Sequence, residues 1–273
     1  MKKVIEMLGL NNKKEVLKEV RKPPSDDSYS MIPPLFTKNN EIGIKTLSLT
    51  ILDLINQNQI KCDIDLNDSY EVGKKLTSDD MEVMKKITLR IANKGELKTS
   101  ETSAINLLKS MNKNKKFNLK YMAKQSNNTS IANKFEKELS EFVKSVKNEN
   151  DYDGKNYKDI LENGKLTRNG KELKKEWEGF RDYLKSEDLC KKYPPESVEE
   201  NSAQILYASC FDIEKEALKP RENNTPLTDF IDKDGYKLLN IVFNNALLNV
   251  SEKRKGDGIF YGVNDKYSIP GGG

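Results

Sequence analysis

The stretch Leu166–Phe211, which reads LTRNGKELKKEWEGFRDYLKSEDLCKKYPPESVEENSAQILYASCF, decides the fold of this chain. It contains the chain's only tryptophan, Trp177, within the clearest helical pattern of the sequence. Apolar residues recur there at intervals of four and three, which places them on one face of an α-helix, and charged residues fill the other face. The apolar face consists of Leu173, Trp177, Phe180 and Leu184.

Pro194 and Pro195 interrupt the helical pattern, because proline fixes φ and disfavours a helical conformation in the residue before it. A second helix is predicted after Ser197, which fits a capping box with Glu200. The apolar positions of this second helix are Leu206, Cys210, Ile213 and Ala217. We therefore expect a helical hairpin around the indole, with a core of Leu173, Trp177, Phe180, Leu184, Leu206 and Tyr207.

Four separate blocks of this stretch share one resemblance: Leu166–Leu173, Trp177–Leu184, Pro194–Val198 and Leu206–Ala208. In order and spacing they resemble the cytoplasmic C-terminal region of the YciQ-like family, a group of uncharacterised predicted membrane proteins of bacteria and archaea. The segment Pro23–Asp65 resembles the start of the same region more weakly, so the resemblance spans roughly Pro23–Leu218. Where family members often have a glycine after a Tyr-Ala pair, this chain has Ser209–Asp212. The resemblance implies a cytoplasmic module with membrane segments upstream, and it implies no catalytic residues.

The composition of the 273 residues, 33% charged and 36% hydrophobic, favours several highly solvated modules over one large core. The formal net charge is +4, which is too balanced to establish a nucleic-acid or membrane partner by itself. No stretch reaches the roughly 18 apolar residues that a membrane span requires. The N-terminal MKKVIEMLGL does not fit a signal peptide either, because Glu6 interrupts its apolar run.

The chain has no histidine, which removes the commonest general base and the commonest metal ligand. Its three cysteines, Cys62, Cys190 and Cys210, are widely separated and fit free thiols in a reducing compartment. Asp63, Asp65 and Asn67 do not continue into a calcium loop, since the glycine and glutamate that such a loop needs are missing. No phosphate-binding glycine motif is present. We therefore expect no enzyme activity, no cofactor and no metal site.

The chain is predicted to be mainly α, of the α+β class, with winged-helix-like modules before a helical bundle. Two proline pairs, Pro23-Pro24 and Pro33-Pro34, favour an extended lead-in, either a linker from a membrane anchor or an arm lying on the first domain. The expected parts are 1–36 (helix and proline-rich arm), 37–78 (helix plus β-hairpin, a first winged-helix-like module), 79–167 (a second such module with a helix-turn-helix), 168–252 (Trp-containing helical domain) and 253–273 (tail).

The first module is predicted from a change of period along residues 41–76. Residues 41–56 have a helical apolar pattern, and Ile60–Leu66 alternates apolar and polar residues as a half-buried strand does. After a polar turn, Tyr70–Leu76 is expected to form the second strand of a hairpin. Thr77 and Asp80 then fit a capping box for a helix carrying Met81, Met84, Ile87 and Ile91, which ends near Gly95, and another helix is expected over 102–111.

Residues 117–148 have the pattern of a helix-turn-helix, with a short helix, a polar turn at Ser126–Asn128 and a long helix capped by Thr129 or Ser130. The interval 105–150 contains ten lysines and four glutamates. The interval 101–150 contains no arginine, which weakens any base readout but leaves phosphate contacts open. The possible nucleic-acid contacts are Lys124, Asn133, Lys134 and Lys137.

Residues 152–167 could supply the wing of the second module, and 238–250 form one more amphipathic helix. The short segment Ile259–Tyr261 is either a strand or a docking segment. Two functions remain open from the sequence. The first is a non-catalytic cytoplasmic module of a membrane protein that binds a protein partner or its own copies, touching the membrane only through segments outside this chain. The alternative is a winged-helix nucleic-acid-binding protein that uses the lysine-rich helix-turn-helix around 118–147.

Overall fold

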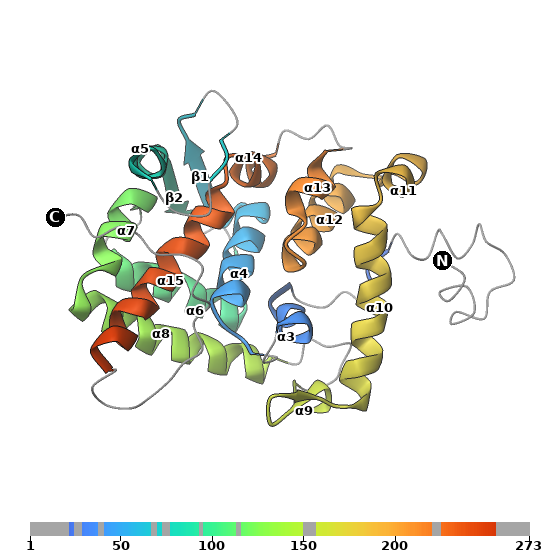
Figure 1. The fold of residues 1–273 in the computed structure, drawn as a ribbon, viewed down its shortest axis with the longest axis horizontal. Coiled ribbons are helices and arrows are strands. Elements are labelled where there is room, and N and C mark those ends of the chain that lie inside the picture. The colour runs from blue at the N-terminus through green and yellow to red at the C-terminus, as the bar shows by residue number, and fades with distance from the viewer. Residues whose placement is uncertain are drawn as a thin grey trace, which may run out of the picture. The chain divides into compact units, whose positions relative to one another are not determined.

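A computed structural model describes residues 22–24, 29–37, 41–66, 70–72, 77–92, 95–112, 116–149, 157–219 and 225–254. Most of these residues are helical, with a few short antiparallel strands, which confirms the predicted mainly α, α+β class (Figure 1). The expected helix within 1–21, the strands at 73–76 and 259–261, and the tail from 255 on lie outside the described residues. Within the described ranges, no helix is long and apolar enough to cross a bilayer.

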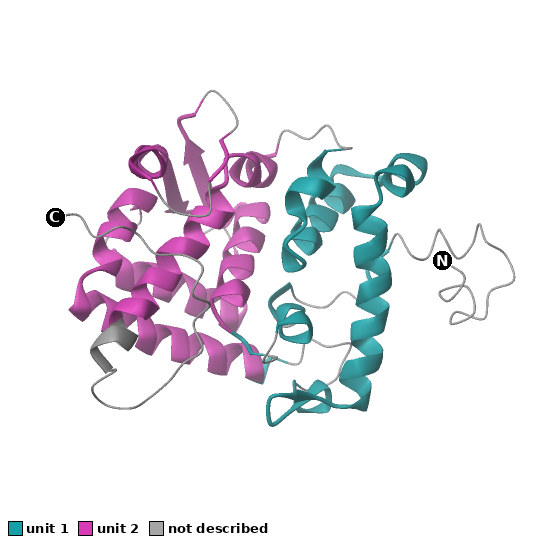
Figure 2. Ribbon diagram, viewed as in Figure 1, with its two compact units in different colours: residues 1–42, 148–223 teal, residues 43–147, 224–273 magenta. Residues whose placement is uncertain are grey.

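The chain forms two compact units, each assembled from two stretches of sequence (Figure 2). Unit 1 comprises residues 1–42 and 148–223, and unit 2 comprises residues 43–147 and 224–273. These boundaries differ from the five consecutive parts expected from the sequence. The predicted Trp-containing domain is divided, because its last helix belongs to unit 2 with the middle of the chain.

Unit 1 is built on the tryptophan helix. Trp177 is completely buried, and its ring lies 5.0 Å from that of Tyr207 and 5.9 Å from that of Phe180. Phe180, Leu184 and Leu206 are buried as predicted, and Leu173 is half-buried. The elements of this unit are η1 (Tyr29–Met31), α3 (Pro33–Phe36), α9 (Tyr157–Ile160), β4 (Leu161–Glu162), β5 (Lys165–Leu166), α10 (Arg168–Lys185), α11 (Glu187–Lys192), α12 (Val198–Cys210) and α13 (Glu214–Leu218).

Tyr29–Phe36, one of the two described parts of the proline-rich lead-in, belongs to the core of unit 1. This segment packs on α10 and α12, and Ile32 and Leu35 are completely buried. The Tyr29 ring lies 4.5 Å from the Tyr207 ring. The segment is therefore not an extended linker.

The second helix of the predicted hairpin is interrupted. Its N-cap is Ser197, whose hydroxyl accepts the Glu200 N–H as expected. The helix α12 ends at Cys210, and Asp212 has a positive φ of 58° before α13 begins. The prediction of a single helix through Ala217 is therefore wrong, because the left-handed residue turns the chain there.

Unit 2 combines a small sheet with helices. Its central helix, α4 (Ile44–Asn56), is buried along most of its length and packs on α6 (Thr99–Met111) and α15 (Gly235–Arg254). The sheet contains β1 (Ile60–Ile64), β2 (Ile87–Ile91) and β3 (Lys116–Asn118) in that order, all antiparallel. The remaining elements are α5 (Ser78–Lys85), α7 (Leu119–Ser126), α8 (Thr129–Asn148) and α14 (Pro226–Asp232).

The described part of the predicted hairpin after Ile60 does not have the expected pairing, and its residues 67–69 and 73–76 lie outside the described residues. β1 pairs with β2 along its whole length, and Tyr70–Val72 is not a strand. The backbone of Val72 is instead held by α15 and the turn before it: the Asp234 carboxylate accepts the Val72 N–H, and Lys237 donates to the Val72 carbonyl. A partner in distant sequence therefore replaces the expected cross-strand partner.

The predicted helix through Ile91 is also wrong in its second half. Thr77 and Asp80 form the expected capping box, but α5 ends at Lys85. Ile87, Leu89 and Ile91 are buried on one side of β2, where they fit the period of two that a strand requires. The spacing of Met84, Ile87 and Ile91 suits a helix as well, and pairing with β1 decides between the two.

Candidate functional site

The predicted nucleic-acid contacts lie on two consecutive helices of unit 2. The helices α7 and α8 form as predicted, separated by Asn127 and Asn128. The cap of α8 is Asn128 and not Thr129 or Ser130, because the Asn128 side-chain oxygen accepts the Ser130 N–H at 3.0 Å. All four predicted contact residues are exposed: Lys124 on α7, and Asn133, Lys134 and Lys137 on α8.

The inner face of α8 explains which of its side chains reach solvent. Phe135 is completely buried and stacks on Phe243 of α15, with 5.4 Å between the ring centroids. Lys134 and Lys137 project from the other face because they lie out of phase with this apolar stripe. The buried stripe consists of Ala132, Phe135, Leu139, Phe142 and Val146.

A second basic surface, which the sequence did not predict, covers the outer face of the sheet. Lys61 on β1 is paired in register with Arg90 on β2, and Arg90 is paired with Lys116 on β3. Their neighbours along each strand, such as Leu89 and Phe117, point into the core. Three cations therefore form one row across the sheet, which we call the cationic row.

An ion pair holds the middle of this row. Arg90 is bonded to the Asp63 carboxylate, and both side chains are about half exposed, 42% and 48%. Within the described residues, neither Lys61 nor Lys116 forms an ion pair. A guanidinium has five N–H donors, so pairing with Asp63 leaves donors available for a phosphate.

Asn118, where β3 ends, organises the region beside the cationic row. Its amide nitrogen donates to the Lys85 carbonyl at 2.6 Å and to the Thr88 hydroxyl at 3.2 Å. Its side-chain oxygen accepts the Tyr121 N–H at 3.3 Å, which caps α7. One side chain thus joins β3 to β2 and to α7, and it fixes the position of the Tyr121 backbone in the first turn of α7.

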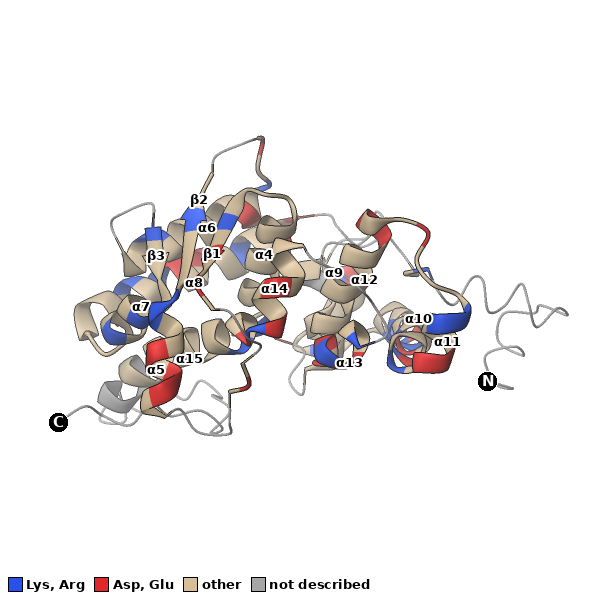
Figure 3. Cartoon of the chain, turned by 90° about the horizontal axis from the view of Figure 1, so that it is seen from above, with Lys and Arg blue, Asp and Glu red and all other residues tan. Residues whose placement is uncertain are grey.

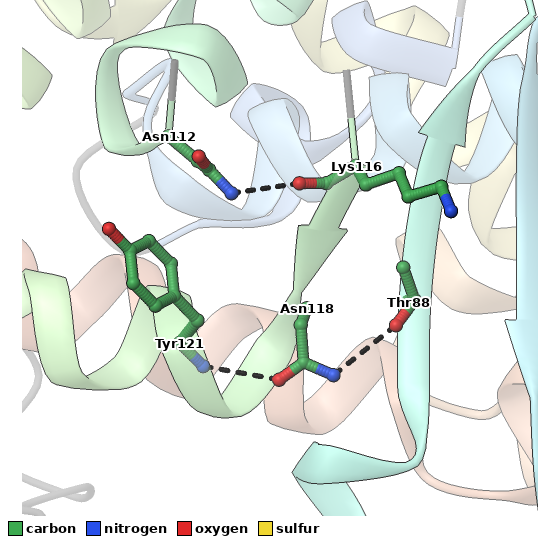
Figure 4. Close-up of a pocket in the computed structure, with 5 residues that line it drawn as sticks. All are labelled: Thr88, Asn112, Lys116, Asn118 and Tyr121. Atoms are coloured by element: carbon green, nitrogen blue, oxygen red, sulfur yellow. Dashed lines mark hydrogen bonds between the residues drawn. The ribbon is translucent and has the colours of Figure 1, made fainter. Parts of the chain in front are cut away.

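Tyr121 borders a hollow of about 420 Å³ that is lined by Thr88, Asn112, Lys116, Asn118 and Tyr121 (Figure 4). The Tyr121 ring lies on one side of this hollow, and the Lys116 side chain extends across toward β2 on another. The Asn112 amide donates to the Lys116 carbonyl at 2.8 Å. Tyr121 is 45% exposed, and among the described residues it is one of only two large apolar side chains that are exposed.

The cationic row borders a second hollow of mixed charge. This hollow, of about 710 Å³, is lined by three carboxylates and three lysines, Lys116 among them, together with Ile64 and Thr88. Lys120 of α7 forms an ion pair with Glu82, and this bond lowers the pKa of the Glu82 carboxyl. Figure 3 shows basic positions on β2, β3 and α7, and the carboxylates of the second hollow lie beside the Lys116 end of the cationic row.

The sequence contained a signal for part of this surface. The alternation of Ile60–Leu66 placed Lys61 and Asp63 on a solvent face, as observed. Arg90 was missed because the apolar spacing of its segment also suits a helix. Lys116 was missed because the short strand β3 precedes α7 without a turn signal.

Within the described ranges, no three cysteine, aspartate or glutamate side chains are grouped as a metal site would require. Comparisons with protein-family models, with curated proteins and with solved structures found no match.

Proposed function

We propose that this chain is a non-catalytic binding module that holds a nucleic acid through basic residues of α7, α8 and the sheet of unit 2. The observation that carries the proposal is that every predicted contact residue on α7 and α8 is exposed, with the cationic row beside α7. Lysines that are not ion-paired are suited to phosphates, because each contact releases counterions from the nucleic acid. A winged helix is not required, since the contacts come from α7, α8 and the sheet.

The small amount of exposed apolar surface also favours a charged partner. Among the described residues, the exposed large apolar side chains are Tyr121 and Val198. Stable protein interfaces usually contain a buried apolar core, which such a surface does not offer. Binding through phosphate contacts needs no such core.

The test is fluorescence anisotropy of labelled duplex and single-stranded DNA with the whole chain. Lys134→Glu combined with Lys137→Glu should weaken binding of both probes by about tenfold or more at low salt. The matched control is Lys171→Glu with Lys175→Glu, two exposed lysines of α10 in unit 1 that give the same change in net charge. If both double variants lost affinity equally, the loss would reflect net charge alone, and the proposal would be contradicted.

A second candidate function is the cytoplasmic interaction module expected from the YciQ-like resemblance, binding a protein partner or a second copy. One observation favours it: Val198 is 62% exposed, and it belongs to the resembling block Pro194–Val198. Sedimentation velocity over a concentration series tests the self-association form. Concentration-dependent dimers that Val198→Asp abolishes would support it, and a monomer at all concentrations would contradict it.

A further inference from the structure

We propose that the outer face of the three-stranded sheet binds a single-stranded nucleic acid, with its phosphates on the cationic row and one base stacked on Tyr121. This inference rests on the proposed function and specifies the form of nucleic acid that unit 2 prefers. It concerns Lys61, Arg90, Lys116 and Tyr121, none of which belongs to the predicted contacts of the helix-turn-helix.

The spacing of the three cations suits the backbone of a single strand. Neighbouring strands lie about 4.8 Å apart, so the cationic row extends about 10 Å across the sheet. The backbone of a single strand can follow such a row, because it is flexible and has one phosphate per nucleotide. The row can therefore bind a strand that crosses the sheet without requiring a fixed helical form.

The exposed aromatic ring of Tyr121 favours a single strand over a duplex. Stacking a base on a tyrosine requires a base face that is not already covered by its neighbours, which single strands offer and duplexes do not. Tyr121 is 45% exposed beside an open hollow of about 420 Å³, so its ring is accessible to a base.

The backbone that carries the Tyr121 ring is held in place before anything binds. Asn118 caps the first turn of α7 at Tyr121, and Lys120, the preceding residue, is ion-paired with Glu82. Ordering a side chain at a binding site costs free energy, so a ring on a fixed helical turn binds more tightly than one on a loose loop.

The hollow also indicates little sequence preference. Both ends of the Asn118 amide are already engaged with the protein, so Asn118 cannot read the edge of a base without losing those bonds. Recognition is then dominated by stacking and phosphate contacts, which every base and every phosphate can supply. Homopolymers are accordingly suitable probes.

The experiment measures anisotropy of labelled oligothymidylate, oligouridylate, a duplex of the same length and an oligoglutamate peptide with the whole chain. The single strands should bind more tightly than the duplex, and the DNA and RNA arms identify which of the two is preferred. Tyr121→Leu should weaken single-strand binding by about 10- to 100-fold, while Tyr121→Phe retains it. Lys61→Glu with Lys116→Glu should weaken it by about tenfold or more, and Lys171→Glu with Lys175→Glu should leave it nearly unchanged.

The outcomes separate this inference from the function on which it rests. If duplex binds as well as single strands, responds to Lys134→Glu with Lys137→Glu and ignores Tyr121→Leu, this inference is overturned and the proposed function stands. If no nucleic acid binds, or the oligoglutamate competes equally well, both are overturned. Because Tyr121 is exposed, circular dichroism of Tyr121→Leu should match that of the unchanged chain.

Discussion

The side-chain oxygen of Asn118 accepts the backbone N–H of Tyr121 at 3.3 Å, so the residue that ends β3 also caps α7. The same side chain donates to the Lys85 carbonyl at 2.6 Å and the Ile87 carbonyl at 3.3 Å. Asn118 therefore connects the end of β3 to the start of α7 and to the residues that lead into β2. The sheet face and the first turn of α7 consequently form one local structure.

Replacing Asn118 should loosen this local structure. Asn118→Ala is expected to lower the free energy of unfolding by about 1–3 kcal/mol, because it removes a helix cap and the bonds to two carbonyls. Asn118→Ser retains a capping oxygen and should cost about 1 kcal/mol less than alanine. Urea denaturation followed by circular dichroism measures both variants. If all three proteins were equally stable, the cap would contribute nothing to the free energy of unfolding.

The indole of Trp177 should dominate the stability of unit 1. Trp177→Ala is expected to cost roughly 3–5 kcal/mol, because it leaves a large cavity between Phe180 and Tyr207. Trp177→Phe should cost less, since the indole N–H has no hydrogen-bond partner among the described residues that the change would remove. Denaturation must be followed by circular dichroism because the variants lack the only tryptophan. A near-neutral Trp177→Ala would contradict the buried cluster.

We expect the buried side chains of Tyr29–Phe36 to contribute to the stability of unit 1. Leu35→Ala and Ile32→Ala are each expected to destabilise unit 1 by about 2–5 kcal/mol, because both side chains are completely buried. The matched control is Thr37→Ala, just after α3, where the side chain is half-buried and a small effect is expected. Urea denaturation measures all three variants. If each of them unfolds at the same urea concentration as the unchanged chain, the segment is a dispensable linker.

Because of the Asp53 carboxyl, we expect the free energy of unfolding to fall as pH rises. Burial and the nearby Glu101 carboxylate raise its pKa from 3.8 to about 7, although a bond from Gln57 at 2.9 Å opposes the shift. Below pH 3.8 the carboxyl is protonated in both states and carries no penalty. Between 3.8 and about 7 the unfolded state ionises first, so stability is lost over that window.

Asp53→Asn should flatten this pH dependence and stabilise the chain above neutral pH. Each unit of pKa shift corresponds to about 1.4 kcal/mol, so the gain is on the order of a few kcal/mol. Urea denaturation at several pH values measures it, and Asp182→Asn on the exposed side of α10 provides the control. A pH profile unchanged by Asp53→Asn would contradict the assignment.

The elements predicted correctly from the sequence are those whose local pattern fits only one kind of secondary structure. The face of Trp177, Phe180 and Leu184 could form only a helix, and the caps at Ser197 and Thr77 were visible as residue pairs. These features depend on neighbours within a few positions. Interactions between residues that are close in sequence are therefore enough to predict these features.

The errors arose where distant residues decided between two acceptable local patterns. Ile87 and Ile91 fit either a helix or a strand, and their pairing with Ile64 and Ile60 selected the strand. Val72 fits a strand, but Asp234 and Lys237 hold its backbone from a helix far along the chain. The sheet face was missed for the same reason, because its row of charges exists only when β1, β2 and β3 align.

The predicted contacts of the helix-turn-helix needed only helical phase. Phe135 and Leu139 define the buried side of α8, so Lys134 and Lys137 had to lie on its exposed side. Tyr121 was not distinguished from a core residue, because an aromatic residue on an amphipathic helix is usually buried.

The most direct measurement for the central claim is the salt dependence of nucleic-acid binding by the whole chain. Anisotropy with oligothymidylate from about 50 to about 200 mM salt should give a steep linear fall of log affinity against log salt. Lys61→Glu with Lys116→Glu should reduce the slope by about 0.7 for each phosphate that the variant no longer neutralises. Binding that is absent at the lowest salt, or that does not change across the series, would contradict the account.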